Sequence, residues 1–411
     1  MFKVVGCGSV NASTSMKKGL GMDEVTKTYS GLMPETRTLF EPPEVLRELV
    51  GLAGVKFNGE NPWDIQVYDD EVFSRVLSYG SLGFGESYME GFWDSHALDD
   101  LFYRLLSYDI EEKFVGWARV RLFGEVIRHR VFNLQSYQRA FQVGEQHYDT
   151  GNDIFEAMLD SSMSYSCGYW QNATNLEQAQ NAKLDMICRK LELKTGDTLL
   201  EIGCGWGGLA YHAAKYYGAK VTGITVSKEQ QKLAQERCTG LAVNIELTDY
   251  RKLEGEFDKI VSVGMFEHVG QKNYSVYFDK ASRLLKDDGL FLLHTIGNYK
   301  TIPMIDPWID KYIFTNGKLP SAAEITSELN DRFLIEDWHN FGHDYDKTLM
   351  AWWENFDSAW PELEPKYGKR FYRMWKYYLL SCAGFFRSRQ GQLWQLILSK
   401  RSRPHIYRSI R

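Results

Sequence analysis

A glycine-rich segment in the middle of the chain is the clearest candidate for ligand chemistry. The run Leu199-Leu-Glu-Ile-Gly-Cys-Gly-Trp-Gly-Gly208 has the pattern of a strand, a glycine turn and a helix that begins near Leu209. Gly203, Gly205 and Gly207 permit a tight turn and a close approach of the backbone to a ligand, which a Cβ would prevent. The pattern predicts a nucleotide-type pocket, although NAD-binding folds and plain strand-to-helix turns share it.

Two details favour S-adenosylmethionine over NAD as the ligand of this loop. Glu201 precedes the first glycine, where methyltransferases place a carboxylate near the cationic methionine end of their cofactor. The next strand ends in Gly223-Ile-Thr-Val-Ser-Lys-Glu-Gln230, without the ribose-binding Asp or Glu that NAD folds carry at its tip. The residues expected to contact the ribose or the adenine are Thr225, Gln230, Tyr250 and Arg251.

A sheet must position these loops. After about Val143 the chain alternates short β-rich runs with helical ones, which is typical of an open, mostly parallel sheet flanked by helices. The strand-like runs are Thr198–Ile202, Lys220–Thr225, Val243–Leu247, Lys259–Val263 and Leu290–Ile296. A helical insertion rich in Trp and Tyr follows, and residues 392–399 have the character of a final antiparallel strand at a sheet edge.

The segment before the sheet has a different pattern. Apolar residues recur at helical spacing from about Pro42 to Gln138, and the glycine-rich segment Gly80–Glu86 interrupts them. Residues 1–35 lack such periodicity and are rich in Ser, Thr, Gly and Lys. We therefore expect a flexible tail over 1–35, a small, mainly helical domain over 36–138, and a catalytic domain over 139–411.

Composition argues against several classes of protein. The net charge of −6 argues against a nucleic-acid binder. The six cysteines form no CxxC pair and no Cys/His cluster, so neither a disulfide framework nor a metal site is expected. The sequence has no apolar run of roughly 20 residues that could span a membrane and no secretory signal. These features predict a cytoplasmic protein.

Two basic segments suggest contact with a membrane surface. The stretch from Lys366 to Arg411 carries twelve Lys or Arg and no Asp or Glu, and the segment Glu111–Ala140 is also net basic, with aromatic residues interleaved. Anionic lipid attracts such segments with about 1 kcal/mol for each basic residue near the surface. The alternative is that these are ordinary solvated helix faces.

Taken together, the motifs give the chain a family resemblance. They are Gly80-Ser-Leu-Gly-Phe-Gly-Glu-Ser-Tyr-Met-Glu-Gly-Phe-Trp93, His147-Tyr-Asp-Thr-Gly-Asn-Asp153, Tyr165-Ser-Cys-Gly-Tyr-Trp170, Leu200–Gly208, Gly264-Met-Phe-Glu-His-Val-Gly270 and Leu293-His-Thr-Ile-Gly297. After about residue 40 the chain resembles the cyclopropane-fatty-acyl-phospholipid synthases and the related mycolic acid cyclopropane synthases. Glu201 stands where many relatives carry Asp, which keeps the charge.

The resemblance implies a Rossmann-like class I methyltransferase fold, with a mostly parallel seven-stranded sheet whose last strand is antiparallel. It also implies transfer of a methylene group from S-adenosylmethionine to the cis double bond of an acyl chain. Because the first motif belongs to the phospholipid-acting branch, unsaturated phospholipid is the expected substrate. By the same resemblance the enzyme is a homodimer that associates peripherally with the inner face of the membrane, and residues 36–138 form a lipid-binding accessory domain. Tyr165 and Ser166 are expected to contact the cofactor.

An alkene is a weak nucleophile, so the reaction needs alignment with the sulfonium carbon, stabilisation of a carbocation and a base shielded from water. Aromatic faces can stabilise the cation, and the candidate wall residues are Tyr165, Tyr169, Trp170, Tyr274 and Phe278. The alternative for each of them, and the more common one, is simple core packing. The resembling family holds bicarbonate as the base. By resemblance its cage here is the Cys167 backbone, Glu267, His294, the Ile296 backbone and Tyr345.

Other interpretations remain open from the residues alone. A fatty-acid methyltransferase would leave a methyl branch, because its cation is quenched without deprotonation, and it need not keep Glu267 and Tyr345 together. A membrane-binding module that has lost catalysis is a third possibility, against which the intact glycine loop counts. Cys382 is interpreted as structural, since methyl transfer to an alkene needs no covalent enzyme intermediate.

Overall fold

The computed structural model describes residues 40–108 and 151–411. Before residue 109 the helices are α1 (Glu44–Gly51), α2 (Glu71–Tyr79), α3 (Ser81–Met89) and α4 (Leu98–Ser107), with short strands β1 (Gln66–Val67) and β2 (Trp93–Asp94). The expected tail over 1–35, the expected domain boundary at 138/139 and the basic segment 111–140 lie outside the described residues.

From residue 151 on, the helices are α8 (Asn152–Met158), α9 (Leu176–Lys190), α10 (Gly208–Tyr217), α11 (Lys228–Arg237), α12 (Tyr274–Leu284), α13 (Pro307–Tyr312), α14 (Ala322–Leu329) and α15 (His343–Arg387). The strands are β3 (Thr198–Ile202), β4 (Lys220–Thr225), β5 (Val243–Leu247), β6 (Phe257–Val263), β7 (Leu285–Asn298), β8 (Leu334–Asn340) and β9 (Gly391–Ser399). Short 3₁₀ segments are η2 (Tyr250–Lys252), η3 (Phe266–His268) and η4 (Gln271–Asn273).

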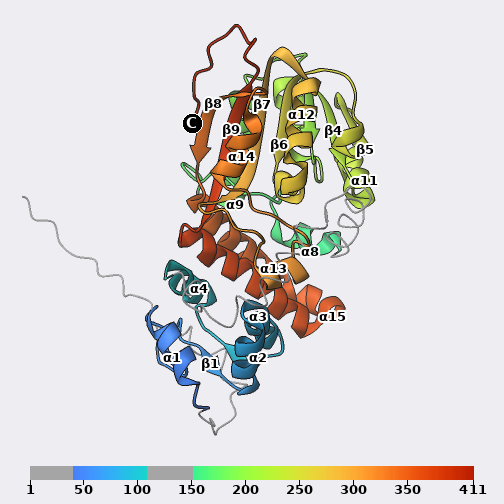
Figure 1. Cartoon of the computed structure of the whole chain (residues 1–411). Coiled ribbons are helices and arrows are strands. Elements are labelled where there is room, and N and C mark those ends of the chain that lie inside the picture. Colours follow the sequence, from blue (N-terminus) through green and yellow to red (C-terminus); the bar gives the residue numbers. More distant parts are fainter. Residues whose placement is uncertain (1–39, 109–150) are drawn as a thin grey trace, which may run out of the picture. The chain divides into compact units, whose positions relative to one another are not determined.

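Seven of the described strands form one mixed sheet in the order β5-β4-β3-β6-β7-β9-β8 (Figure 1). Neighbours from β5 to β7 pair in parallel, whereas β9 is antiparallel to both β7 and β8. The five predicted parallel strands and the antiparallel direction of the last strand are confirmed. Its expected place at an edge is wrong, because β9 lies between β7 and β8 and is buried along almost its whole length.

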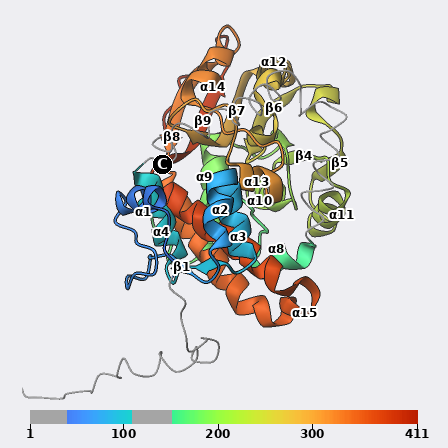
Figure 2. The ribbon, with the colours of Figure 1, turned by 60° about the horizontal axis from the view of Figure 1, so that its bottom comes forward.

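Helices cover both faces of this sheet (Figure 1). Alternate strand residues face opposite sides, so Leu199 packs in the cluster with α9, α10 and α11, while Leu200 packs with α12 and α14. The α/β architecture follows from strands that are apolar on both faces. It places the carboxyl ends of the parallel strands at one end of the sheet. Figure 2 shows the molecule with the helices at this end turned toward the reader.

The glycine-rich segment 80–86 does not interrupt the helical pattern, as the sequence suggested, but mostly forms helix α3. The break is at Gly80 alone, which has a φ of 60° between α2 and α3. A Cβ at Gly83 would lie 2.2 Å from the carbonyl oxygen of Arg75, and one at Gly85 would lie 2.5 Å from the Trp308 ring. These glycines therefore permit close packing of α3 against α2 and α13.

Helix α15 connects the N-terminal helices with the sheet. It contacts α3, α4 and α8 as well as β9, and its backbone leaves helical geometry at Gly368, three residues after Pro365. The expected helical insertion rich in Trp and Tyr is confirmed by α13, α14 and α15. No helix within residues 40–108 and 151–411 is long and apolar enough to cross a membrane.

Candidate active site

Many of the predicted site residues lie in or just after the carboxyl-terminal parts of five neighbouring parallel strands. The glycine loop follows β3, Thr225 ends β4, and Tyr250 follows β5. Glu267 lies in η3 after β6, and His294 lies within β7, paired with Val263 at the end of β6. Parallel strands bring all these ends to one edge of the sheet, which is where open α/β sheets bind ligands.

The glycine loop has the backbone that the sequence predicted. Gly203, Gly205 and Gly207 all have positive φ angles, of 83°, 52° and 82°. Gly203 and Gly205 line a large cavity, and a Cβ on Gly205 would project into open space. Gly207 is not among the lining residues; it precedes α10 and lies against Ala234 of α11. Gly207 therefore contributes to the conformation of the turn without facing the cavity.

Glu201 is buried at the end of β3 and lines the same cavity. Burial raises the pKa of Glu201 to about 8, although Lys183 and the backbone of Ala210 oppose the shift. Its Oε2 atom has no hydrogen-bond partner among the described residues. A buried oxygen in this state calls for a donor from a ligand, so the site fits the ammonium group of the methionine end of S-adenosylmethionine.

The residues expected around the ribose and adenine lie next to the loop. Thr225 donates to Gln230 Oε1 at 2.8 Å, which orders both side chains. Arg251 is held by Asp249 through contacts of 2.7 and 2.6 Å. Thr225, Gln230, Tyr250 and Arg251 all line the cavity, and their contact with the ribose and adenine stays a prediction.

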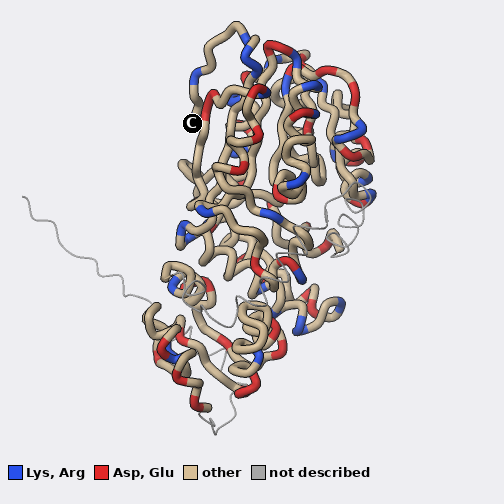
Figure 3. The backbone as a smooth tube through the Cα atoms, in the orientation of Figure 1, with Lys and Arg blue, Asp and Glu red and all other residues tan. Residues whose placement is uncertain are grey.

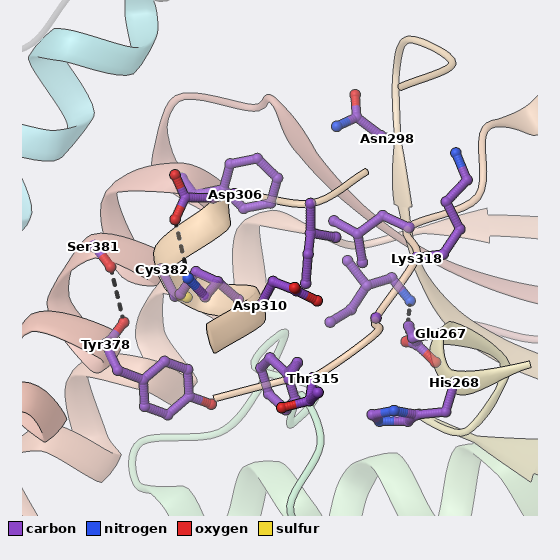
Figure 4. Close-up of a pocket in the computed structure, with 18 of the residues that line it drawn as sticks. Glu267, His268, Asn298, Asp306, Asp310, Thr315, Lys318, Tyr378, Ser381 and Cys382 are labelled. Atoms are coloured by element: carbon purple, nitrogen blue, oxygen red, sulfur yellow. Dashed lines mark hydrogen bonds between the residues drawn. The ribbon is translucent and has the colours of Figure 1, made fainter. Parts of the chain in front are cut away.

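Glu267 supplies the carboxyl group of the proposed bicarbonate cage. Its Oε1 accepts from the backbone N–H of Ile296 at 2.7 Å, and its backbone carbonyl accepts from Lys318 N at 2.9 Å (Figure 4). Burial raises the pKa of Glu267 to about 7, against the lowering effect of the Ile296 N–H. Its Oε2 has no partner within the described part of the chain. The Ile296 N–H thus orients Glu267, which leaves one carboxyl oxygen available to a ligand.

His294 and Tyr345 present donors to the same cavity. Gln395 Nε2 lies 3.1 Å from His294 Nδ1; an amide nitrogen can only donate, so Nδ1 accepts and Nε2 carries the proton. Burial lowers the pKa of His294 well below its ordinary value, so the ring is neutral. Its Nε2 finds no acceptor among the described residues, and the Tyr345 hydroxyl forms no hydrogen bond with them. Both groups can therefore donate to an anion.

Residues 165–167 lie partly at the cavity and partly in the core. Tyr165 and Ser166 line the cavity, and the Tyr165 hydroxyl lies 2.6 Å from that of Tyr378. Cys167 is fully buried, and its thiol faces the Gly168 carbonyl and Thr348. The side chain of Cys167 therefore does not reach the cavity, and only its backbone could face a ligand there.

Most of the candidate aromatic wall residues do not line the cavity. Tyr274 and Phe278 pack on Phe266 in the core, with ring centroids 4.4 and 5.5 Å apart, because α12 turns them toward the sheet. Tyr169 and Trp170 do not line the cavity either, so Tyr165 is the one member confirmed there. Among the other aromatic residues that line it are Phe314, Tyr377, Tyr378, Phe385 and Phe386.

Cys382 of α15 also lines this cavity (Figure 4). Burial raises the pKa of its thiol to about 12, so it stays protonated at neutral pH. A protonated thiol is a poor nucleophile, which agrees with the expectation that Cys382 is not a catalytic nucleophile.

The cavity is larger than one cofactor requires. Its volume of about 2900 Å³ exceeds the roughly 300–1000 Å³ typical of small-molecule sites. From the polar groups at the strand ends it continues along α13 and α15 to an apolar part between the N-terminal helices. That part is lined by Val45, Leu46, Leu49, Val50, Phe57, Ile65, Val72, Phe73, Val76 and Leu77.

The sheet order, the glycine loop and this cavity define a class I S-adenosylmethionine-dependent methyltransferase, and the structural neighbours agree. The cyclopropane synthase MmaA2 from Mycobacterium tuberculosis matches with a TM-score of 0.61 and 30% identity, over 66% of this chain and all of that one. Residues 135–396 match the model of the mycolic acid cyclopropane synthetase family. The chain belongs to this family.

Two further relatives are similar to this chain. The cyclopropane-fatty-acyl-phospholipid synthase of Escherichia coli strain K12 is 54% identical over 356 residues, which cover 87% of this chain and 93% of that protein. The mycolic acid cyclopropane synthase CmaA1 in complex with SAH and CTAB has 31% identity and a TM-score of 0.60, over 63% of this chain and 98% of that one. The first relative thus also spans the N-terminal helices, since 87% coverage exceeds the family match.

Proposed function

We propose that the chain transfers a methylene group from S-adenosylmethionine to the cis double bond of an unsaturated acyl chain in a membrane phospholipid, forming a cyclopropane ring. The cavity is the observation that carries this proposal. It joins the glycine loop to an apolar channel, and Glu267 and His294 also line the cavity. A water-soluble substrate would not need such an apolar channel, whereas an acyl chain fills it.

The channel also opens to the surface. Val45 of α1 and Leu77 and Tyr79 of α2 line the cavity, yet 54%, 45% and 56% of these residues are exposed. Exposed apolar residues around an opening suit a lipid that enters from a membrane surface. The N-terminal helices would therefore deliver the acyl chain, which is the accessory role expected of residues 36–138.

At the reacting end, S-adenosylmethionine supplies the methyl group when bound. Tyr165, Tyr378 and Phe314 offer aromatic faces that can stabilise positive charge in a dry site. Ring closure then requires a proton to leave the new methyl group. Three polar groups that line the cavity could hold the base that accepts it: the Glu267 carboxyl, the His294 Nε2–H and the Tyr345 hydroxyl.

This donor set suits bicarbonate as the base. The free Glu267 oxygen can accept the hydroxyl proton of the ion, while His294 and Tyr345 can donate to its oxygens. A carboxylate beside an anion is normally repelled, but the hydrogen bond that Glu267 would accept from the hydroxyl of the ion offsets this repulsion. Bound bicarbonate would take up the proton that the methyl group loses.

We also propose a homodimer that associates peripherally with membranes, as the family resemblance implies. The test of the main proposal uses the purified chain, S-adenosylmethionine and vesicles of a monounsaturated phospholipid. We expect mass spectrometry to find a gain of one CH₂ unit and NMR to find loss of the alkene protons with new ring protons. A methyl-branched product would instead favour the fatty-acid methyltransferase alternative, and unchanged lipid would contradict the proposal.

A further inference from the structure

Lys183 is a buried cation whose position the proposed chemistry leaves unexplained. It lies on α9, is 2% exposed and lines the cavity beside Glu201 and Ser166. Its Nζ donates to Ser166 Oγ at 2.9 Å. Within the described residues no carboxylate lies within 4.0 Å of its Nζ. Asp160 and Glu201 favour the charged form of Lys183 electrostatically but do not contact its Nζ, so the buried ammonium group still lacks an anion in direct contact.

The hydrogen bond to Lys183 fixes the role of Ser166. A lysine ammonium has no acceptor, so Ser166 Oγ must accept this bond and keep its own proton for another partner. No described residue accepts that proton. Gln180, one turn earlier on α9, holds the Ser166 carbonyl at 2.8 Å. The Ser166 hydroxyl can therefore donate to a ligand in the cavity, and it accepts a hydrogen bond from the positively charged Lys183.

Glu201 identifies the kind of anion. It lies next to this pair with an unpartnered Oε2 and can accept from an ammonium group. A carboxylate acceptor and a cation-backed hydroxyl donor, side by side, are complementary to the ammonium and carboxylate groups of an α-amino acid. The methionine end of S-adenosylmethionine carries both groups on one carbon.

We infer that Lys183 is a positioning residue that, through the Ser166 hydroxyl, selects the α-carboxylate of S-adenosylmethionine. The inference rests on S-adenosylmethionine being the co-substrate. It requires nothing of the lipid or of bicarbonate, so it can fail while the proposed function stands.

The test measures affinity by calorimetry for S-adenosylmethionine and for its decarboxylated analogue, without lipid. The wild-type chain should prefer the intact ligand by about tenfold to a hundredfold, the range of one charge-assisted hydrogen bond. Lys183→Met keeps the length of the side chain and removes its charge. It should weaken binding of the intact ligand and leave the affinity for the analogue nearly unchanged, so that the preference disappears.

Lys190→Met is the matched control, because Lys190 is also buried on α9 but contacts His339 and does not line the cavity. It should keep the preference. Ser166→Ala should remove the preference by itself, which keeps the test available if Lys183→Met does not fold. Equal weakening of both ligands by Lys183→Met, an unchanged preference in Ser166→Ala, or a loss of affinity that appears only with added bicarbonate would overturn the inference.

Discussion

Glu267 is the side chain on which ring closure depends most in this account. Glu267→Gln keeps its shape but removes the acceptor for a bicarbonate hydroxyl, so turnover of unsaturated phospholipid should fall by roughly 10²-fold or more. Tyr345→Phe removes a donor to the same ion. The two losses should not add in the double variant, because both residues hold one group. Calorimetry should find S-adenosylmethionine affinity unchanged; near-normal turnover, or fully additive losses, would place the base elsewhere.

The raised pKa of Glu267 also makes a prediction about stability. The ordinary pKa is 4.5 and the folded one is about 7, so between these pH values the folded protein keeps a proton that the unfolded chain releases. The free energy of unfolding must therefore decrease as the pH rises across this interval, by up to about 3 kcal/mol. Glu267→Gln removes this effect. Denaturant unfolding should find the variant gaining stability relative to the wild type from pH 5 to pH 8, and a constant difference would contradict the assignment.

The sequence could identify most site residues because each one lies in a recognisable motif, several of them in or just after a strand. Glu201, Thr225, Gln230, Glu267 and His294 all reach the cavity for that reason. Lys183 and the later aromatic residues of α15, Tyr377 and Tyr378, gave no comparable signal. Lys183 lies on a helix well before the glycine loop, and Tyr377 and Tyr378 reach the cavity only because α15 packs against the N-terminal helices. Contacts of that kind arise in the folded chain and leave no local pattern.

At the level of elements, the two strands nearest the end of the chain show where sequence patterns succeed and fail. Strand β8 was not predicted, because its exposed edge position allows the polar run Leu-Ile-Glu-Asp-Trp-His-Asn. Strand β9 was predicted but misplaced. Its nearly continuous apolar run is typical of a strand buried on both faces, which argues for an interior place rather than an edge.

The contact between α3 and α13 should matter for lipid turnover. A Cβ at Gly85 would lie 2.5 Å from Trp308, whereas one at Gly51, at the end of α1, would meet nothing within 4 Å. Gly85→Ala should therefore destabilise the protein by about 1–3 kcal/mol through overpacking. It should also reduce lipid turnover, because α13 lines the channel, while S-adenosylmethionine binding persists.

Gly51→Ala provides the matched control, since alanine is the better helix former and finds space there. Thermal unfolding should show a lower midpoint for the Gly85 variant alone. Equal midpoints and equal lipid turnover for the two variants would show that the close contact of α3 with Trp308 is unimportant.

At the scale of the whole molecule, charge alone supports membrane contact less than the sequence suggested. Lys and Arg are interspersed with Asp and Glu over the described residues (Figure 3). Seven of the twelve basic residues after position 365 form ion pairs with carboxylates: Lys366, Arg370, Arg373, Arg387, Lys400, Arg403 and Arg411. The apolar mouth of the cavity is therefore expected to contribute strongly to membrane binding.

Vesicle co-sedimentation can separate these contributions. Binding to anionic vesicles should exceed binding to neutral ones and weaken as salt rises. Leu77→Asp should reduce binding to both kinds, because it places a charge at the apolar mouth. Tyr216→Ser is the control, since Tyr216 is 63% exposed on α10 and does not line the cavity. A response to neither lipid charge nor salt, or an equal loss in both variants, would remove the membrane-surface interpretation.

The central claim is that the methyl carbon becomes a ring carbon after losing one proton inside the cavity. The most direct measurement supplies S-adenosylmethionine with a trideuterated methyl group and analyses the lipid product by mass spectrometry and deuterium NMR. The account predicts a cyclopropane ring whose new carbon carries two deuterons, the third having been lost to the base. A product that keeps an intact trideuterated methyl branch would contradict it, because no deprotonation at that carbon would then have occurred.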